Sequence, residues 1–89
     1  MRIPSYTKQF AKDLKRMEKR RKAQGKIKRI IKKLIDEECL DAIYKDHKLM
    51  GNFKGRRECH IEPDWLLIYK IIDSEIIFER TGTHSDLFE

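Results

Sequence analysis

The apolar residues of this sequence change their spacing once, near Gly55, and that change constrains the fold more than any other feature. Before Gly55, apolar residues recur at the three- and four-residue intervals of a helix. After it they alternate with polar residues or form a short unbroken run, and β-branched and aromatic residues become frequent. The sequence therefore predicts helices followed by a sheet. We expect one α+β domain over residues 1–89.

Two amphipathic helices are predicted in the first half. Phe10, Leu14 and Met17 form a narrow apolar stripe, and Thr7 is a suitable N-cap before it. Gly25 disfavours a helix interior by roughly 1 kcal/mol relative to Ala, so we expect a break near it and an antiparallel helix pair. The second stripe consists of Ile27, Ile30, Ile31, Leu34 and Ile35.

The second half predicts three strands joined by turns at Pro63-Asp64 and Asp73-Ser74. The middle strand is apolar on both faces apart from Lys70, which is typical of a central strand. Short turns between successive strands indicate an antiparallel meander. The predicted strands cover residues 56–62, 65–72 and 75–81.

A short strand is also predicted before the helices, at residues 2–5, where Pro4 restricts it to an edge of the sheet. The element order is then β-α-α-β-β-β: a small antiparallel-meander sheet with an N-terminal edge strand and a two-helix hairpin on one face. Residues 36–52 form a connector that is long enough to carry function.

The charge of the chain is strongly uneven. Its net charge is +6, but residues 1–35 hold 14 Lys and Arg against two acidic residues, whereas residues 36–89 hold 7 against 13. A basic half of this kind suits binding to a polyanion such as RNA, although a solvated lysine-rich helix face would have the same composition.

The sequence also bears on the compartment. Its longest apolar run is five residues, far short of the roughly 20 that span a bilayer, and its N-terminus lacks the apolar stretch of a secretion signal. We therefore expect a cytoplasmic protein that does not contact membranes. In a reducing cytosol Cys39 and Cys59 are expected to be free thiols.

The three histidines, His47, His60 and His84, are the first candidates for chemistry. Strand alternation places Cys59 and Ile61 on the face that meets the helices and His60 on the open face, together with Arg56, Glu58 and Glu62. The same alternation suggests that Arg80 lies beside His60 across the sheet.

A metal site and a cysteine nucleophile are both disfavoured. Cys59 and His60 are adjacent on a strand and project to opposite faces, and no ligand pair has the short spacing of a zinc site. Cys59 should face the core, where nothing activates its thiol. No cofactor is expected.

General acid–base cleavage of RNA matches these residue types better than a metal site or a cysteine nucleophile does. Histidine has a pKa near 6.5, so one ring can take the proton of an RNA 2′-OH and another can protonate the leaving 5′ oxygen. Arg80 would stabilise the phosphate in the transition state. Trp65 and Phe88 would stack on unpaired bases, unless Trp65 belongs to the core and Phe88 anchors the C-terminus.

Four motifs in the second half resemble, in their residues and in their order along the chain, the YafQ branch of the RelE/ParE toxin superfamily. The most specific of them contains His60-Ile61-Glu62-Pro63-Asp64-Trp65, and together they occupy residues 46–49, 51–55, 57–69 and 80–88. The helical half is similar only in character. The resemblance implies a RelE-like fold and a type II toxin that enters the A site of the 70S ribosome and cleaves mRNA. It also implies a cognate antitoxin, with a toxin that is monomeric alone and forms a higher-order complex with that antitoxin.

The resemblance also assigns roles to residues. His84 would be the general acid, Asp64 or His47 the base, and His60 would orient or stabilise. Arg80, Trp65 and Phe88 would contact the substrate. The basic half would contact ribosomal RNA through Lys12, Lys15, Arg16, Lys19, Arg20, Lys28 and Lys32.

A different class of function stays open at this point. The ParE branch shares the fold but inhibits DNA gyrase without this set of histidines, and a plain RNA-binding or antitoxin-binding module is also compatible with the sequence. In either case the three histidines would be expendable. A degraded toxin that is retained for its antitoxin is a third reading.

Overall fold

The computed structural model describes residues 1–88, and within them five strands form one sheet in the order β1-β5-β4-β3-β2. Strand β1 runs parallel to β5, and every other neighbouring pair is antiparallel. The predicted α+β class, the meander and the edge position of the first strand are confirmed. The strand bounds are β1 (Ile3–Tyr6), β2 (His47–Lys48), β3 (Arg57–Glu62), β4 (Trp65–Ile72) and β5 (Glu75–Gly82).

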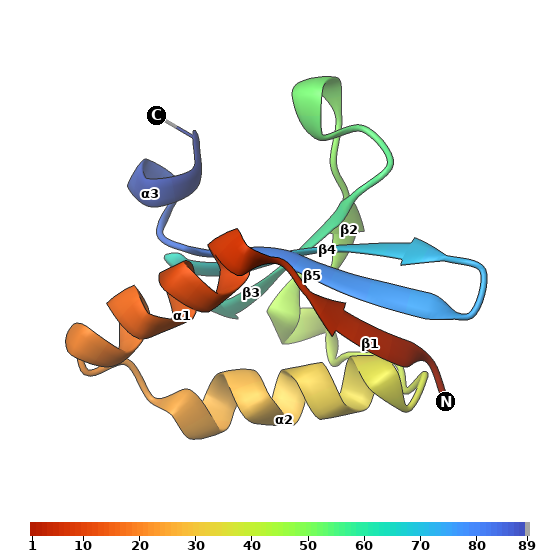
Figure 1. Ribbon diagram of the computed structural model, residues 1–89, viewed down its shortest axis with the longest axis horizontal. Coiled ribbons are helices and arrows are strands. Elements are labelled where there is room, and N and C mark those ends of the chain that lie inside the picture. Colours follow the sequence, from red (N-terminus) through yellow and green to blue (C-terminus); the bar gives the residue numbers. More distant parts are fainter. Residues whose placement is uncertain (89) are drawn as a thin grey trace.

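Helices α1 (Lys8–Lys19) and α2 (Gln24–Ile35) cover the same face of the sheet (Figure 1). The Thr7 hydroxyl accepts a hydrogen bond from the Phe10 N–H at 2.9 Å, which confirms the predicted N-cap. The chain reverses before Gly25, through Arg21 at φ 60°, and Gly25 itself lies in the first turn of α2. The glycine penalty applies to a helix interior, and Gly25 lies near the start of α2 instead.

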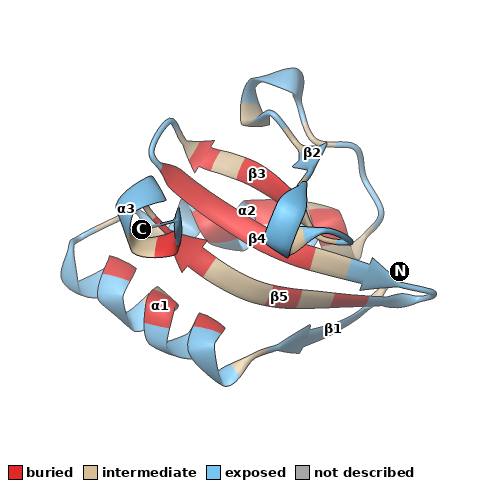
Figure 2. Cartoon of the chain, turned by 90° about the horizontal axis from the view of Figure 1, so that it is seen from above, coloured by how far each residue is buried: buried red, intermediate tan, exposed pale blue. Residues whose placement is uncertain are grey.

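Strand β4 is the centre of the molecule and is buried over most of its length (Figure 2). One face of the sheet packs against α1 and α2. The opposite face, called the open face below, carries a smaller cluster of Leu66, Ile68 and Leu87, with Leu49 and Phe53 against it. The predicted central strand is confirmed. The main core contains Phe10, Met17, Ile27, Ile30, Leu34, Cys59, Ile61, Trp65, Leu67, Tyr69, Ile76 and Phe78.

The predicted connector contains local structure that its sequence did not indicate. It includes the 3-10 helices η1 (Ala42–Tyr44) and η2 (Gly51–Phe53), and between them β2 pairs with β3. A further short helix, α3 (His84–Phe88), follows β5. Figure 1 shows α3 and the η2 loop on the side of the sheet away from α1 and α2. These short segments carry two of the three histidines.

Two register shifts change which way strand residues point. One lies between His60 and Glu62, and it turns Glu62 from its predicted place on the face of His60 toward the helices. The Glu62 carboxylate binds Lys22 at 3.3 Å and Lys26 at 2.9 Å. The other shift lies in the pairing of β4 with β5, between Ile68 and Tyr69.

No helix within residues 1–88 has the length and hydrophobicity needed to cross a bilayer.

Candidate active site

The three imidazole rings lie together at the open face, next to the edge of β3. His47 comes from β2, His60 from β3 and His84 from the first position of α3. The ring centroids of His47 and His60 are 6.2 Å apart, and those of His60 and His84 are 5.9 Å apart. The predicted convergence of these residues, which we call the histidine cluster, is confirmed. His47 and His84 are exposed and His60 is half-buried, so an external substrate can reach them.

Asp64 fixes the orientation of His84. Its Oδ1 lies 2.6 Å from Nδ1 of His84 and accepts the backbone N–H of the same residue at 2.9 Å. These two interactions, the backbone one first, lower the pKa of Asp64 below its ordinary value. An ionised carboxylate only accepts hydrogen bonds, so Nδ1 of His84 carries the proton and Nε2 is the nitrogen left for chemistry.

His60 is held in the same tautomer. Its Nδ1 lies 3.3 Å from the carbonyl oxygen of Pro63, which can only accept. Nδ1 of His60 therefore donates, and Nε2 carries the lone pair of the neutral ring. The β3–β4 turn thus orients two imidazoles, His60 through Pro63 and His84 through Asp64.

His47 differs from the other two because both of its ring nitrogens face acceptors. Nδ1 lies 2.6 Å from the Lys45 carbonyl oxygen, and Nε2 lies 3.2 Å from Oε2 of Glu58. Only a doubly protonated ring can donate to both at once. Glu58 is 5% exposed, and its Oε1 has no hydrogen-bond partner among the described residues. Sequence reasoning placed Glu58 on the face of His60 but assigned it no role.

Helix α3 is fastened at its start by a reciprocal cap. Asp86 accepts the Thr83 N–H at 2.9 Å, and the Thr83 hydroxyl accepts the Asp86 N–H at 3.2 Å. Arg20, just after α1, donates two hydrogen bonds to the same carboxylate, at 2.7 and 3.1 Å. Buried Leu87 adds an apolar anchor. Together these contacts fix the position of His84.

The two predicted aromatic contacts have different outcomes. Phe88 is 44% exposed and lies beside His84, with a centroid separation of 6.3 Å, and Phe53 packs edge-on against it at 5.3 Å. Trp65 is fully buried, and its Nε1–H donates to the Thr81 hydroxyl at 3.0 Å. The prediction that Trp65 stacks on a substrate base is wrong, because its ring belongs to the core beneath the helices.

Arg80 does not lie beside His60, contrary to the prediction. The residue opposite His60 across β4 is Gly82, through Leu66, whereas Arg80 pairs with Ile68 farther along the strand. The Arg80 guanidinium binds buried Asp13 on α1, at 2.7 and 3.3 Å. Its role in binding phosphate stays a prediction.

The seven basic residues predicted to contact ribosomal RNA are all exposed on α1, α2 and the turn after α1. Some already have acidic partners: Arg16 and Arg20 pair with Asp86, and Lys32 pairs with Asp36. Lys12, Lys15, Lys19 and Lys28 form no ion pair with another described residue.

The cysteines lie outside the cluster. Both are free, Cys39 at the surface and Cys59 in the core, where burial raises the pKa of the thiol. Among residues 1–88, no group of three or more His, Cys, Asp or Glu side chains is arranged to hold a metal ion.

Comparisons with known proteins agree on one family. The model of the family described as bacterial toxin of type II toxin-antitoxin system, YafQ, matches residues 2–89. The mRNA interferase toxin YafQ of Escherichia coli K12 is 50% identical over 84 residues, which are 93% of this chain and 91% of that protein. The crystal structure of YafQ from E. coli BL21(DE3) superposes with a TM-score of 0.95, 47% identity and full coverage of both chains. A crystal structure of the E. coli DinJ-YafQ complex gives a TM-score of 0.94 at 48% identity, also with full coverage of both chains. This chain belongs to the YafQ family of bacterial toxins of type II toxin–antitoxin systems.

Proposed function

We propose that this toxin enters the A site of the 70S ribosome and cleaves mRNA there by metal-independent acid–base catalysis. Its assignment as an endoribonuclease follows from its likeness, at 50% identity over most of the chain, to relatives named mRNA interferase toxin. The observation that carries the mechanism is the pair of imidazoles His60 and His84. Both are held through Nδ1, with ring centroids 5.9 Å apart, so that their Nε2 atoms are available to a substrate.

In the proposed reaction, the 2′ oxygen attacks the adjacent phosphorus and the bond from phosphorus to the 5′ oxygen breaks. A base removes the 2′ proton and an acid protonates the leaving 5′ oxygen, which leaves a 2′,3′-cyclic phosphate and a 5′-OH. His84 is the acid, because the Asp64 carboxylate at 2.6 Å from Nδ1 fixes the ring and leaves Nε2 to donate a proton to the substrate.

The base is His60 in this scheme. Sequence reasoning chose Asp64 or His47, but Asp64 is engaged in orienting His84, and both nitrogens of His47 face acceptors. His60 keeps a free Nε2. His47, as an imidazolium held between Lys45 and Glu58, would stabilise the negative charge that develops on the phosphate.

The remaining surfaces suit an RNA substrate and a protein inhibitor. Exposed Phe88 and half-buried Phe53 form an aromatic pair beside His84 on which an unpaired base can stack. The exposed lysines of α1 and α2 would contact ribosomal RNA. Since YafQ of E. coli forms a complex with DinJ, we expect this toxin to bind a cognate antitoxin, in a complex of higher order than the free monomer.

The test is cleavage of a defined message on translating ribosomes, with the RNA ends mapped at nucleotide resolution. His84→Ala and His60→Ala should reduce cleavage by about 10²-fold or more, in proteins whose circular dichroism matches wild type. Glu75→Gln, an exposed change at the other end of β5, is the control and should leave cleavage unchanged. If cleavage persists in His84→Ala, the assigned acid is wrong. If growth arrest survives alanine at all three histidines while messages stay intact, the toxin acts without cleaving RNA.

A further inference from the structure

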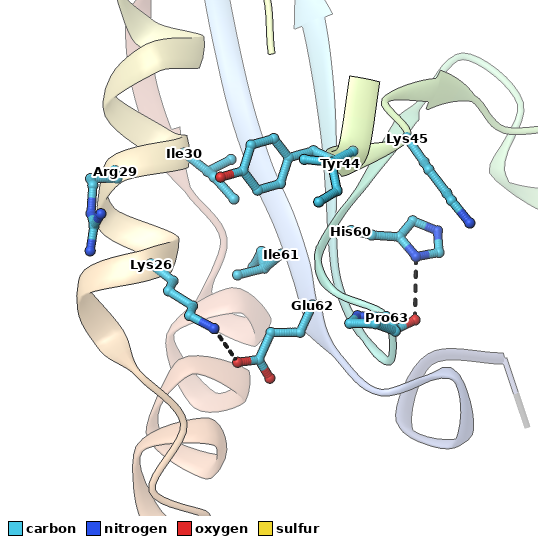
Figure 3. Close-up of a pocket in the computed structure, with 10 residues that line it drawn as sticks. Lys26, Arg29, Ile30, Tyr44, Lys45, His60, Ile61, Glu62 and Pro63 are labelled. Carbon is cyan, nitrogen blue, oxygen red and sulfur yellow. Dashed lines mark hydrogen bonds and ion pairs between the residues drawn. The ribbon is translucent and has the colours of Figure 1, made fainter. Parts of the chain in front are cut away.

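A cavity of about 520 Å³ lies between α2, η1 and the outer edge of β3, beside the histidine cluster (Figure 3). Tyr44 reaches from η1 toward Ile30 on α2, and Lys45 and His60 lie on the side away from α2 (Figure 3). His60 therefore belongs both to this cavity and to the cluster. The scheme proposed above leaves the rest of the cavity without a role.

The walls of the cavity are apolar. Ile30 and Ile61 are buried at its base, Tyr44 is half-buried, and Ile43 is 74% exposed at the rim. Ile43 and Tyr44 extend the apolar walls from the base of the cavity to its rim. A nucleobase, which is flat and apolar on both faces, matches such walls.

The rim is positively charged. Arg29 and Lys45 line it, and neither forms an ion pair with another described residue. Glu62 is the lining residue with a carboxylate, and that carboxylate is already neutralised by Lys22 and Lys26. The cavity therefore presents net positive charge to a ligand, as binding of a phosphate requires.

The outer edge of β3 borders the cavity. β2 begins at His47, opposite Glu58, so among the described residues no strand pairs with the outer edge of β3 beyond Glu58. His60, Ile61 and Glu62 of this edge line the cavity, so β3 forms one of its walls.

Lys45 links the cavity to the chemistry. It lies in the left-handed region, at φ 48°, which is uncommon for a residue other than glycine. Its carbonyl oxygen accepts a hydrogen bond from His47 at 2.6 Å, while its side chain lines the cavity. A ligand in the cavity would therefore touch the same residue that orients His47.

We propose that this cavity is a nucleotide subsite. It would receive one unpaired RNA base flanking the scissile phosphate, which stacks on Tyr44 while Arg29 and Lys45 bind the neighbouring phosphate. The inference rests on the proposed function, because it takes the histidine cluster to be the cleavage site. The shared residue His60 favours RNA over a segment of the antitoxin.

The direct test uses a trinucleotide RNA whose central 2′-OH is replaced by hydrogen so that it cannot be cleaved. Titrated into ¹⁵N-labelled toxin, it should shift the amide signals of the cavity residues. Tyr44→Leu keeps the apolar volume but removes the ring, and it should weaken binding roughly tenfold. Tyr44→Phe should bind like wild type. Arg29→Gln should also bind more weakly, and Lys33→Gln, which removes a charge from the same helix outside the cavity, is the matched control.

The ribosome assay supplies a second readout. Tyr44→Leu should raise KM more than it lowers kcat, and it should change which base flanks the cleavage site. The subsite is overturned if the trinucleotide shifts only residues outside the cavity, or if Tyr44→Leu keeps wild-type binding and flanking-base preference. It is also overturned if Tyr44→Leu cleaves normally but no longer binds its antitoxin. If wild type fails to cleave RNA while the trinucleotide still shifts the cavity residues, the proposed function fails and the nucleotide site stands.

Discussion

Asp64 accepts two hydrogen bonds from His84, one from its backbone N–H at 2.9 Å and one from its ring at 2.6 Å. The turn between β3 and β4 thereby holds the first residue of α3, which lies 20 positions later in the chain. Asp64 thus fixes the position, the tautomer and the charge environment of the proposed acid together.

Asp64→Asn tests this arrangement. Asparagine keeps the shape and one acceptor oxygen but removes the negative charge beside Nδ1 of His84. We expect kcat to fall by about 10²-fold with little change in KM. Single-turnover kinetics on ribosome-bound message measure both. An unchanged kcat would mean that Asp64 has no part in the acid step.

Asp86 should make the stability of the fold depend on acid pH. The hydrogen bond from Arg20 is the first cause that lowers the pKa of Asp86 below the unfolded-state value of 3.8. The stabilisation is therefore fully present above about pH 4 and is lost as pH falls through the folded-state pKa. Because Asp86→Asn weakens the α3 cap, we expect it to cost about 1 kcal/mol in the free energy of unfolding at neutral pH.

Urea denaturation of wild type and Asp86→Asn at pH 7 and at pH 3 measures this effect. The difference between the two proteins should be largest at pH 7 and should begin to shrink at pH 3, below the ordinary carboxyl pKa of 3.8. A difference that stays constant or grows toward pH 3 would contradict the role given to the ionised carboxylate.

Gly82→Ala should disturb the site by displacing α3. A Cβ at this position would lie 2.9 Å from both Cβ and Oδ2 of Asp86, closer than such atoms approach, so the start of α3 must move. We expect cleavage to fall by up to about 100-fold, since small displacements of a catalytic group have effects of this size. Gly25→Ala is the control: its Cβ meets nothing nearer than Arg29 at 3.9 Å, and it should cleave like wild type.

Trp65→Phe tests whether Trp65 acts in core packing or in substrate binding. The change removes the hydrogen bond from Nε1 to Thr81 and part of a fully buried ring, and should lower the free energy of unfolding by about 1–3 kcal/mol. Cleavage per folded molecule, measured well below the melting temperature, should stay at the wild-type level. A stable variant that loses cleavage would restore the substrate role that burial argues against.

The parts of the fold that follow from the sequence are those with many periodic residues. The stripes of α1 and α2 and the doubly apolar β4 are each long enough for their spacing to report which face is buried. β2 has two residues and α3 has five, so neither contains a full period. What holds them is distant in sequence: β3 pairs with β2, and Arg20 and Asp64 fasten the start of α3.

Strand alternation and motif resemblance predicted part of the site correctly and misplaced two of its residues. Strand alternation correctly placed the side chains of His60 and Cys59 on opposite faces of the sheet, and the motif resemblance added His47 and His84 to the site. Alternation failed at Glu62, because one extra residue in β3 reverses the facing of those beyond it. It failed at Arg80, because this residue pairs with Ile68 rather than Leu66 and its guanidinium binds Asp13 on α1. The choice of His60 over His47 as the base needed atomic contacts, namely the acceptors beside each ring nitrogen.

The chemical form of the new RNA 3′ end tests the central claim most directly. A message cleaved on translating ribosomes should carry a 2′,3′-cyclic phosphate, or the 3′-phosphate that its hydrolysis gives, and a 5′-OH on the downstream fragment. The same ends should form at the same rate with a transition-metal chelator added to the magnesium buffer that the ribosome needs, and His84→Ala should form almost none. A 3′-OH end, or loss of cleavage with the chelator, would contradict 2′-OH attack driven by the histidine cluster.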